Sequence, residues 1–345
     1  MKIQVYSSTI RRKEMDAVLS CMVEEKTGPG ELNSRLVQSV KEFFGLSGAV
    51  ALRSPSLALK YALKALGVEK GAKIIISALA PDWQFSSIVD LGFVPLVLDV
   101  SSTNALLEVE KIKSNLTEDI RAILYHETCG LLPNMEELLE LGIPVIEDIS
   151  QSCLSSIAEK KAGTFGVYSI LGLEERDLLT SGGGAVLMAA ASRDWTVLKN
   201  TIDSIPVTDK LPDINSALAF VQLKEANKNE EIRKKMYELY MGSLMQGRHK
   251  SLVCTVENSV QSVFSFPVVL ENGMKDVKVY AGKKDIEIAP AFEGSIVCVR
   301  SEDEEISERC INAKSLYLRC VNFPLYPMLG NSQASKIAKV LATLP

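Results

Sequence analysis

The sequence predicts an α/β protein with a large domain around a mostly parallel, doubly wound sheet and a smaller C-terminal α+β domain. Between residues 48 and 148, short β-branched runs alternate with helical patterns, which is the order of a parallel sheet with crossover helices. These runs are apolar throughout instead of alternating with polar residues, as strands covered on both faces are. After about residue 245 the order changes to short strands followed by helices, which favours a second, smaller unit.

The elements follow from these patterns in chain order. The strands expected in the large sheet are GAVAL, KIIISA, VPLVLDV, RAILY and PVIEDI, and helical segments such as LALKYALKAL and NMEELLELG separate them. A long helix with polar faces is expected from Asn215 to Met245, and such helices often link domains. Beyond it we expect strands at VFSFPVVL, VKVYA and IEIAP, then helices near residues 304–318 and 333–344. The expected domains are residues 1–214, with an N-terminal helical segment, and residues 215–345.

Composition indicates an enzyme-sized globular protein. The chain has 345 residues, of which 47% are hydrophobic, enough for a large core. Its 38 basic and 43 acidic residues give a net charge of −5, so neither nucleic acid nor an anionic membrane is an expected partner. The seven cysteines show no CxxC pair or metal-ligand spacing, which predicts free thiols and no metal site. No signal core and no run near the roughly 20 residues of a membrane span is present, so we expect a cytoplasmic protein.

The most informative stretch is PVIEDISQS, residues 144–152. An apolar strand ends there in Glu147 and Asp148, and Gln151 follows three residues later. Open α/β sheets bind ligands at the carboxyl ends of their strands, so Asp148 is expected to face a ligand. A buried carboxylate is costly unless a cation pairs with it, and the pyridinium nitrogen of pyridoxal phosphate is one such cation.

At these residues the chain resembles the DegT/StrS family of pyridoxal-phosphate-dependent sugar aminotransferases. The family signature EDAAQ corresponds to EDISQ at residues 147–151, and further matches in family order are GPG, ALRSPSLAL, GTFG, GGGAV and NFPLYP. Each motif alone is weak, but together they cover nearly the whole chain. The resemblance implies a fold-type-I transferase fold, pyridoxal or pyridoxamine phosphate as cofactor unless none is bound, a nucleotide-sugar ligand and a homodimer. In that dimer the hairpin Ser181–Gly184 and Asn215 would meet the partner.

The position of the family's Schiff-base lysine is the main departure. In the family this lysine lies between GTFG and a glycine-rich hairpin, and counting back from Gly183 and Gly184 places Arg176 there. Arginine stays protonated at physiological pH and cannot attack an aldehyde. No lysine lies between Gly166 and Ala189, and Lys160 and Lys161 precede the GTFG motif. The resemblance therefore implies a divergent member that cannot form the internal aldimine.

The resemblance also supplies candidates for the phosphate and ring contacts. Ser54, Pro55 and Ser56 match the Ser-Gly-Thr turn that holds the phosphate in the family, although proline removes one N–H group. Serine as N-cap before a proline is equally an ordinary helix start. Pro81 stands at the ring-stacking position, so Trp83 either replaces the aromatic side chain or packs in the core.

Histidine offers a partial alternative, because the family's sugar 3-dehydratases carry histidine in place of the lysine and use pyridoxamine phosphate. The two histidines of this chain lie elsewhere. His126 ends an expected strand beside the ligand edge and is either a site residue or a structural histidine. His249, between Arg248 and Lys250, is expected in solvent.

Three interpretations stay open. The chain is a non-catalytic family member that keeps the fold and a nucleotide-sugar pocket, an enzyme that holds its cofactor without a lysine, or an ordinary aminotransferase whose lysine lies elsewhere or comes from a partner chain. For the first interpretation we expect Arg176 to fill the cofactor space and to pair with Asp148, Glu174 or Glu175. Arg176→Ala would then destabilise the fold by about 3 to 5 kcal/mol, because a buried charge would lose its partner.

Overall fold

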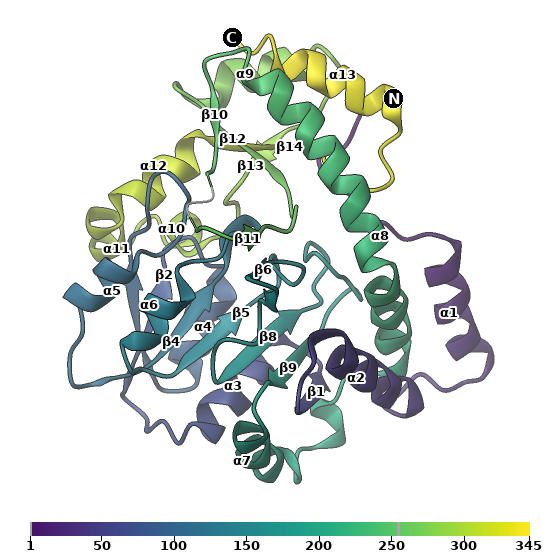
Figure 1. The fold of residues 1–345 in the computed structure, drawn as a ribbon, viewed down its shortest axis with the longest axis vertical. Helices are drawn as coiled ribbons and strands as arrows, with labels where there is room; N and C mark the ends of the chain where they lie inside the picture. Colours follow the sequence, from purple (N-terminus) through teal and green to yellow (C-terminus); the bar gives the residue numbers. More distant parts are fainter. Residues whose placement is uncertain (1, 254–255) are drawn as a thin grey trace.

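The computed structural model describes residues 2–253 and 256–345, and its centre is a seven-stranded sheet (Figure 1). In spatial order the strands are β1 (Gly48–Leu52), β9 (Ala185–Ala189), β8 (Tyr168–Gly172), β5 (Val145–Asp148), β4 (Ile120–His126), β2 (Lys73–Ser77) and β3 (Val94–Leu98). Neighbours from β8 to β3 pair parallel, whereas β9 pairs antiparallel with both β8 and β1. The mostly parallel sheet is confirmed, with the strand that follows the glycine-rich hairpin running in the opposite direction.

The strands are apolar throughout because both faces of the sheet are buried. In β9, Ala185, Leu187 and Ala189 belong to the core shared with helix α3, while Val186 and Met188 belong to the core shared with helix α2. The helices of this part of the chain are α1 (Arg12–Val23), α2 (Glu31–Phe44), α3 (Pro55–Ala65), α4 (Asp82–Asp90), α5 (Val109–Ser114), α6 (Met135–Glu140) and α7 (Ser192–Ile202). Short 3-10 turns lie at Thr128–Gly130 and Val207–Asp209.

The long helix α8 (Asp213–Leu244) runs from α1 and α2 to the C-terminal elements (Figure 1), as the sequence predicts. A second, antiparallel sheet lies beyond it, with the order β10 (Lys250–Ser251), β12 (Phe266–Val269), β14 (Cys320–Phe323) and β13 (Ala289–Pro290). A small third sheet contains β11 (Ser259–Val260), β6 (Ser156–Ile157) and β7 (Lys160–Lys161). The remaining helices are α9 (Met274–Gly282), α10 (Ile296–Val299), α11 (Glu304–Arg309), α12 (Ile311–Arg319) and α13 (Asn331–Leu341). We propose that the division at residue 214 separates two domains that α8 links.

Two local predictions are wrong. VKVYA forms the end of helix α9, not a strand, since Val277 and Ala281 are buried four residues apart on one helix face. His249 is buried, not solvated: its Nε2 lies 3.0 Å from the carbonyl oxygen of Pro345, and its Nδ1 accepts a hydrogen bond from the Glu271 N–H at 3.3 Å. These contacts join β10 to the chain's last residue.

Other predictions concern the chain's chemistry. All six cysteines that the structure describes are free; the seventh, Cys254, lies outside the described residues. The described part of the chain holds no group of three His, Cys, Asp or Glu side chains that could bind a metal ion. Within the same residues, no helix is long and apolar enough to span a bilayer.

Candidate functional site

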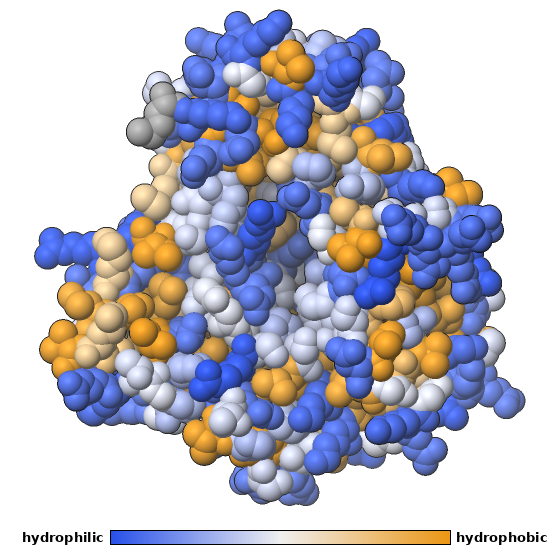
Figure 2. Space-filling model, turned by 180° about the vertical axis from the view of Figure 1, so that it is seen from behind, coloured by the Kyte–Doolittle hydropathy of each residue, from blue (hydrophilic) through white to orange (hydrophobic). Residues whose placement is uncertain are grey.

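A cavity of about 320 Å³ lies at the carboxyl end of β5, where the sequence predicts a ligand. We call it the central cavity. The lining comes from residues 5–8, the strand-end loops with Asp148 and Gln151, the segment 174–178, and the second sheet near residues 289–291 and 322–326. Further lining residues from other parts of the chain are Pro81, Trp83, His126, Arg233, Phe264, Ser265 and Glu293. Seen from behind, the molecular surface is hollowed between the part containing the second sheet and the part containing the large sheet (Figure 2).

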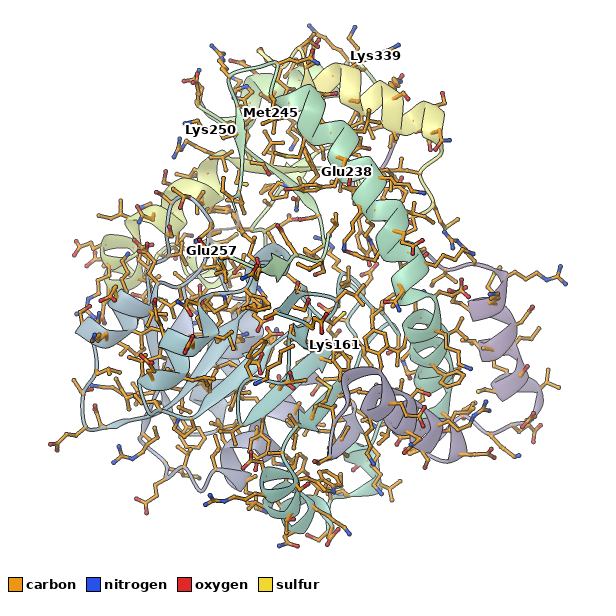
Figure 3. All side chains as sticks on the ribbon, in the orientation of Figure 1. Lys161, Glu238, Met245, Lys250, Glu257 and Lys339 are labelled. Atoms are coloured by element: carbon orange, nitrogen blue, oxygen red, sulfur yellow. The ribbon has the colours of Figure 1, made fainter. Side chains whose placement is uncertain are left out.

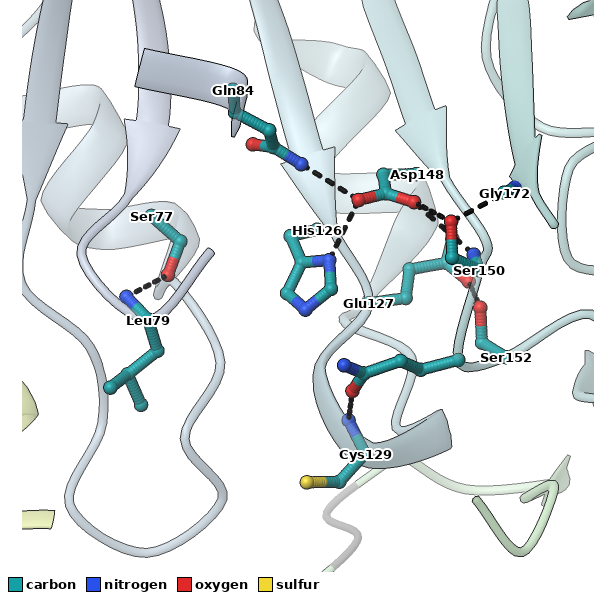
Figure 4. A network of polar contacts seen from close by, with 11 residues as sticks. Ser77, Leu79, Gln84, His126, Glu127, Cys129, Asp148, Ser150, Ser152 and Gly172 are labelled. Carbon is teal, nitrogen blue, oxygen red and sulfur yellow. Dashed lines mark hydrogen bonds and ion pairs between the residues drawn. The ribbon is translucent and has the colours of Figure 1, made fainter. Parts of the chain in front are cut away.

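Asp148 is buried at the end of β5 and accepts hydrogen bonds at both carboxylate oxygens (Figure 4). Its Oδ2 accepts from Gln84 Nε2 at 2.7 Å and lies 2.9 Å from His126 Nδ1. Its Oδ1 accepts from the Ser150 hydroxyl at 2.5 Å and from the Ser150 N–H at 3.2 Å. Burial acts to raise the pKa of Asp148, but His126 and the Ser150 donors hold that pKa below its usual value. Because a carboxylate has about four acceptor positions, those of Asp148 are occupied by its own chain.

His126 and Gln151 both line the central cavity. His126 ends β4, and the parallel register pairs it with Asp148 on β5. Gln151 Oε1 accepts a hydrogen bond from the Cys129 N–H at 2.7 Å, which fixes the loop after β4 against the EDISQ segment. Of the two roles left open for His126, the structure shows a buried histidine that is paired with Asp148 and also lines the cavity.

Glu147, beside Asp148, points to the other side of the strand and holds the GTFG turn. It is fully buried, and its carboxylate accepts the backbone N–H groups of Gly163 (2.8 Å), Phe165 (2.8 Å) and Gly166 (2.6 Å). The adjacent acids of the EDISQ motif therefore have different tasks. Glu147 anchors the turn that precedes β8, and Asp148 belongs to the cavity.

Arg176 does not fill the central cavity, so its predicted pairing with Asp148, Glu174 or Glu175 is wrong. Its side chain is 69% exposed at the rim, and its Nη1 lies 3.3 Å from Oε2 of Glu293, itself 56% exposed. Since Asp148 already has partners within its own chain, it does not draw this arginine into the cavity. An exposed ion pair contributes about 0 to 1 kcal/mol to stability. The large loss of stability predicted for Arg176→Ala is therefore no longer expected.

The described lining of the central cavity contains no lysine that could form a Schiff base with the cofactor. Lys161, whose pKa burial lowers, is held against α2 instead (Figure 3). Its Nζ donates to the carbonyl oxygen of Phe43 and lies 4.1 Å from the centre of the Phe43 ring.

The residues matching the family's phosphate turn have other contacts. Ser54 is the N-cap of α3 and accepts a hydrogen bond from the Leu57 N–H at 3.2 Å, with Pro55 in the first helical turn. Ser56 accepts from the Ser87 hydroxyl at 2.7 Å. None of these serines appears in the described lining of the cavity, whereas Pro81 and Trp83 do.

Sequence reasoning missed several lining residues. Asp177 lies between the glutamates and the hairpin, accepts the Glu174 N–H at 2.8 Å, and has a pKa that burial raises to about 8, with Asp148 and Glu174 adding to the rise. Tyr6, Arg233 and Asn322 also line the cavity. Asn322 begins the NFPLYP motif quoted above, whereas Tyr6 and Arg233 belong to none of the quoted motifs. Gln84, which donates to Asp148, lies inside the segment APDWQF that the sequence had singled out.

Comparisons with known proteins place this geometry in a family. The model of the DegT/DnrJ/EryC1/StrS aminotransferase family matches residues 8–342. The chain belongs to this family. It is 20% identical over 370 residues to GDP-perosamine synthase of Vibrio cholerae, with 98% of each chain covered. It is 22% identical over 362 residues to the Escherichia coli O157:H7 enzyme of the same name, with 98% of this chain and 97% of the relative covered.

Solved structures show the same fold. The putative sugar aminotransferase Spr1654 of Streptococcus pneumoniae, in its pyridoxamine-phosphate form, superposes with a TM-score of 0.88 at 16% identity, covering 99% of this chain and 97% of that one. The GDP-4-keto-6-deoxy-D-mannose-3-dehydratase of E. coli, with bound hydrated pyridoxal phosphate, gives 0.86 at 18% identity, covering 99% and 100%. These structures confirm the fold-type-I architecture, and pyridoxal or pyridoxamine phosphate is the cofactor of these neighbours.

As arranged, the residues of this chain do not fit that cofactor in its lysine-linked form. The described lining contains no lysine, and Arg176, which the sequence resemblance aligns with the family's lysine, lies exposed at its rim. The acceptor positions of Asp148, which a pyridinium nitrogen would need, are taken by Gln84, His126 and Ser150. The hydroxyl groups of Ser54 and Ser56 serve a helix cap and a neighbouring serine.

Proposed function

We propose that this chain is a family member that binds a nucleotide sugar in the central cavity and does not carry out lysine-dependent transamination. Arg176 carries the proposal, because the sequence resemblance aligns it with the family's lysine and its side chain lies exposed at the rim. Without an amine that can lose its proton, the attack on the cofactor's aldehyde has no nucleophile. The fold and the cavity are retained without that chemistry, which describes a pseudoenzyme.

The ligand class is supported by the relatives and by the cavity. One solved neighbour, a GDP-4-keto-6-deoxymannose-3-dehydratase variant, holds GDP-perosamine. The cavity of about 320 Å³ lies within the usual range for small-molecule sites and offers both aromatic and polar side chains. A sugar's hydroxyl groups would find hydrogen-bonding partners in the carboxyl groups of Glu174 and Asp177. A cytoplasmic location is part of the proposal, supported by the free described cysteines.

A binding and turnover experiment tests this function. Titration of the protein with GDP-, UDP- and dTDP-linked hexoses in a calorimeter should detect binding of at least one of them. With pyridoxal phosphate and L-glutamate present, no 2-oxoglutarate should form with a 4-keto sugar nucleotide as acceptor, because Arg176 cannot shuttle an amino group through a Schiff base. Formation of 2-oxoglutarate at rates typical of enzymes would instead support the ordinary aminotransferase. Absence of binding to every sugar nucleotide would overturn the ligand class.

A second function is favoured by the exposure of Arg176. With that side chain outside, Asp148 and His126 line a cavity that remains open. The open cavity leaves room for pyridoxamine phosphate held without a covalent bond, as the second interpretation requires, with the ring nitrogen taking the place of Gln84 or His126 at Oδ2 of Asp148. Saturable uptake of pyridoxamine phosphate, lost in His126→Ala, would favour this enzyme over the non-catalytic protein.

We also propose that the chain forms a homodimer. Four apolar side chains on α1 are strongly exposed at helical spacing: Met15 (56%), Leu19 (56%), Met22 (56%) and Val23 (76%). An apolar patch is visible on the side of the molecule where α1 lies (Figure 2). Exposed stripes of this kind mark surfaces that associate. The hairpin and the start of α8 are joined by Asn215, whose Nδ2 donates to the Ser181 carbonyl oxygen at 2.8 Å.

Sedimentation velocity at micromolar concentration measures this assembly directly. We expect a species of twice the 37.7 kDa chain mass. A stable species at the mass of one chain would contradict the homodimer.

A further inference from the structure

Arg233 is a buried cation without a partner. It lies on α8, is only 8% exposed and lines the central cavity. Within residues 2–253 and 256–345, its guanidinium forms no hydrogen bond and no ion pair. Glu230, three residues earlier, attracts it electrostatically without forming an ion pair. One oxygen of that carboxylate accepts the Val263 N–H at 2.8 Å, and the other has no hydrogen bond.

A guanidinium in this position is unfavourable unless something else neutralises it. Moving a charged group from water into the protein interior costs far more free energy than moving a neutral side chain. Folded proteins offset that cost by giving the buried charge a partner. Burial lowers the pKa of Arg233, but arginine keeps its charge at physiological pH. The central cavity therefore contains a permanent positive charge that the described chain leaves available.

Three other residues of the lining, Tyr6, Ser265 and Asn322, also have a buried polar atom without a hydrogen-bond partner. These atoms are the hydroxyl oxygens of Tyr6 and Ser265 and the Oδ1 atom of Asn322. Tyr6 lies close enough to Arg233 for the two side chains to interact electrostatically. The amide of Asn322, on β14, presents either its oxygen or its N–H groups, since the two orientations are an assignment. Buried polar atoms without partners are uncommon in folded proteins, so their grouping in one cavity indicates a missing ligand.

We propose that Arg233, Tyr6 and Asn322 form a binding site for an oxyanion, the carboxylate or phosphate group of the cavity's ligand. The planar guanidinium donates two parallel hydrogen bonds to either group, and the tyrosine hydroxyl supplies a third donor. Four acidic side chains also line the cavity: Asp148, Glu174, Asp177 and Glu293. Glu293 pairs with Arg176, and Asp148 accepts hydrogen bonds from Gln84 and Ser150, so neither is a partner of Arg233. This inference rests on the proposed function, which makes the cavity a ligand site. Its test is independent of amino transfer.

Anion binding by the purified full-length protein tests the site. Wild type is titrated with inorganic phosphate, pyrophosphate and succinate, with neutral succinamide as control, and binding is followed by calorimetry and thermal unfolding. Arg233→Met removes the charge and the guanidinium donors and keeps an unbranched side chain that can fill most of the same space. Arg12→Met makes the same charge change at a side chain that is 91% exposed, away from the cavity lining.

We expect at least one anion, but not succinamide, to bind wild type and Arg12→Met equally. Arg233→Met should bind that anion roughly tenfold to a hundredfold more weakly. Without ligand, Arg233→Met should unfold at the same temperature as wild type or higher, since an unpaired buried charge is gone; a purely structural arginine would give a lower temperature. Binding of phosphates alone assigns the site to a phosphate group, and binding of succinate alone assigns it to a carboxylate.

The variant Tyr6→Phe keeps the site testable if Arg233→Met does not fold. Its hydroxyl has no hydrogen bond to lose, so the fold should be unaffected while anion binding weakens severalfold. Equal anion affinity in wild type and the site variants, or no anion binding by wild type, would overturn the proposal. Either result leaves the amino-transfer test of the proposed function unaffected.

Discussion

Glu147→Ala should lower the free energy of unfolding by about 3 to 5 kcal/mol, because three buried N–H groups lose their shared carboxyl acceptor at once. The carboxylate is fully buried and receives the N–H groups of Gly163, Phe165 and Gly166. Water cannot replace it easily, since the turn lies directly under the sheet: a Cβ atom at Gly166 would come within 2.5 Å of the Val145 carbonyl oxygen. The turn that leads into β8 would lose its anchor.

Chemical denaturation followed by circular dichroism measures this loss. Glu147→Gln should be destabilised less than Glu147→Ala, because one amide oxygen still accepts hydrogen bonds. Glu140→Ala, at an exposed position on α6, is the matched control and should change stability by less than about 0.5 kcal/mol. A loss below about 1 kcal/mol in Glu147→Ala would show that the N–H groups find other partners.

Asp177→Asn should become more stable than wild type as the pH rises, gaining about 2 to 3 kcal/mol relative to wild type between pH 5 and pH 8. Burial, with Asp148 and Glu174 nearby, raises the pKa of Asp177 to about 8. A carboxyl whose pKa is raised in the folded protein gives its full contribution to stability below the unfolded pKa, near 4. It loses that contribution as the pH rises through 8, because the folded protein must then accommodate the charge.

Stability curves at several pH values separate this effect from a general one. Asparagine has no proton to lose, so the difference between Asp177→Asn and wild type should grow from pH 5 to about pH 8 and stay constant above it. Asp90→Asn, at an exposed position on α4, should give a small difference that does not change with pH in this range. A difference for Asp177→Asn that is equally flat would mean that Asp177 ionises in the folded protein as it does in solvent.

Much of the fold could be predicted because its signals are local. The apolar runs of the large sheet, the long helix α8 and the ligand edge at Asp148 each follow from a few adjacent residues. VKVYA was less certain, since a five-residue run with apolar residues at alternate positions also places two of them on one helix face. The burial of Val277 and Ala281 on one face favours the helix over the strand.

The contacts of the site could not be predicted because they join distant parts of the chain. Asp148 obtains its donors from Gln84 and His126, 64 and 22 residues away in sequence. That pairing removes the reason for Arg176 to turn inward, so one missed contact produced the wrong orientation of another residue. Similarly, Tyr6 and Arg233 line the same cavity and interact electrostatically only because the N-terminal segment lies beside α8 there.

The most direct test of the central claim is borohydride reduction in the presence of pyridoxal phosphate, followed by peptide mass mapping. A Schiff base with any lysine at the central cavity would be reduced to a stable adduct on that peptide. We predict no adduct on any lining residue of the wild-type cavity, because the described lining contains no lysine to form the imine. A pyridoxyl-lysine mapped to a cavity peptide of the wild-type protein would contradict the account and restore the ordinary aminotransferase.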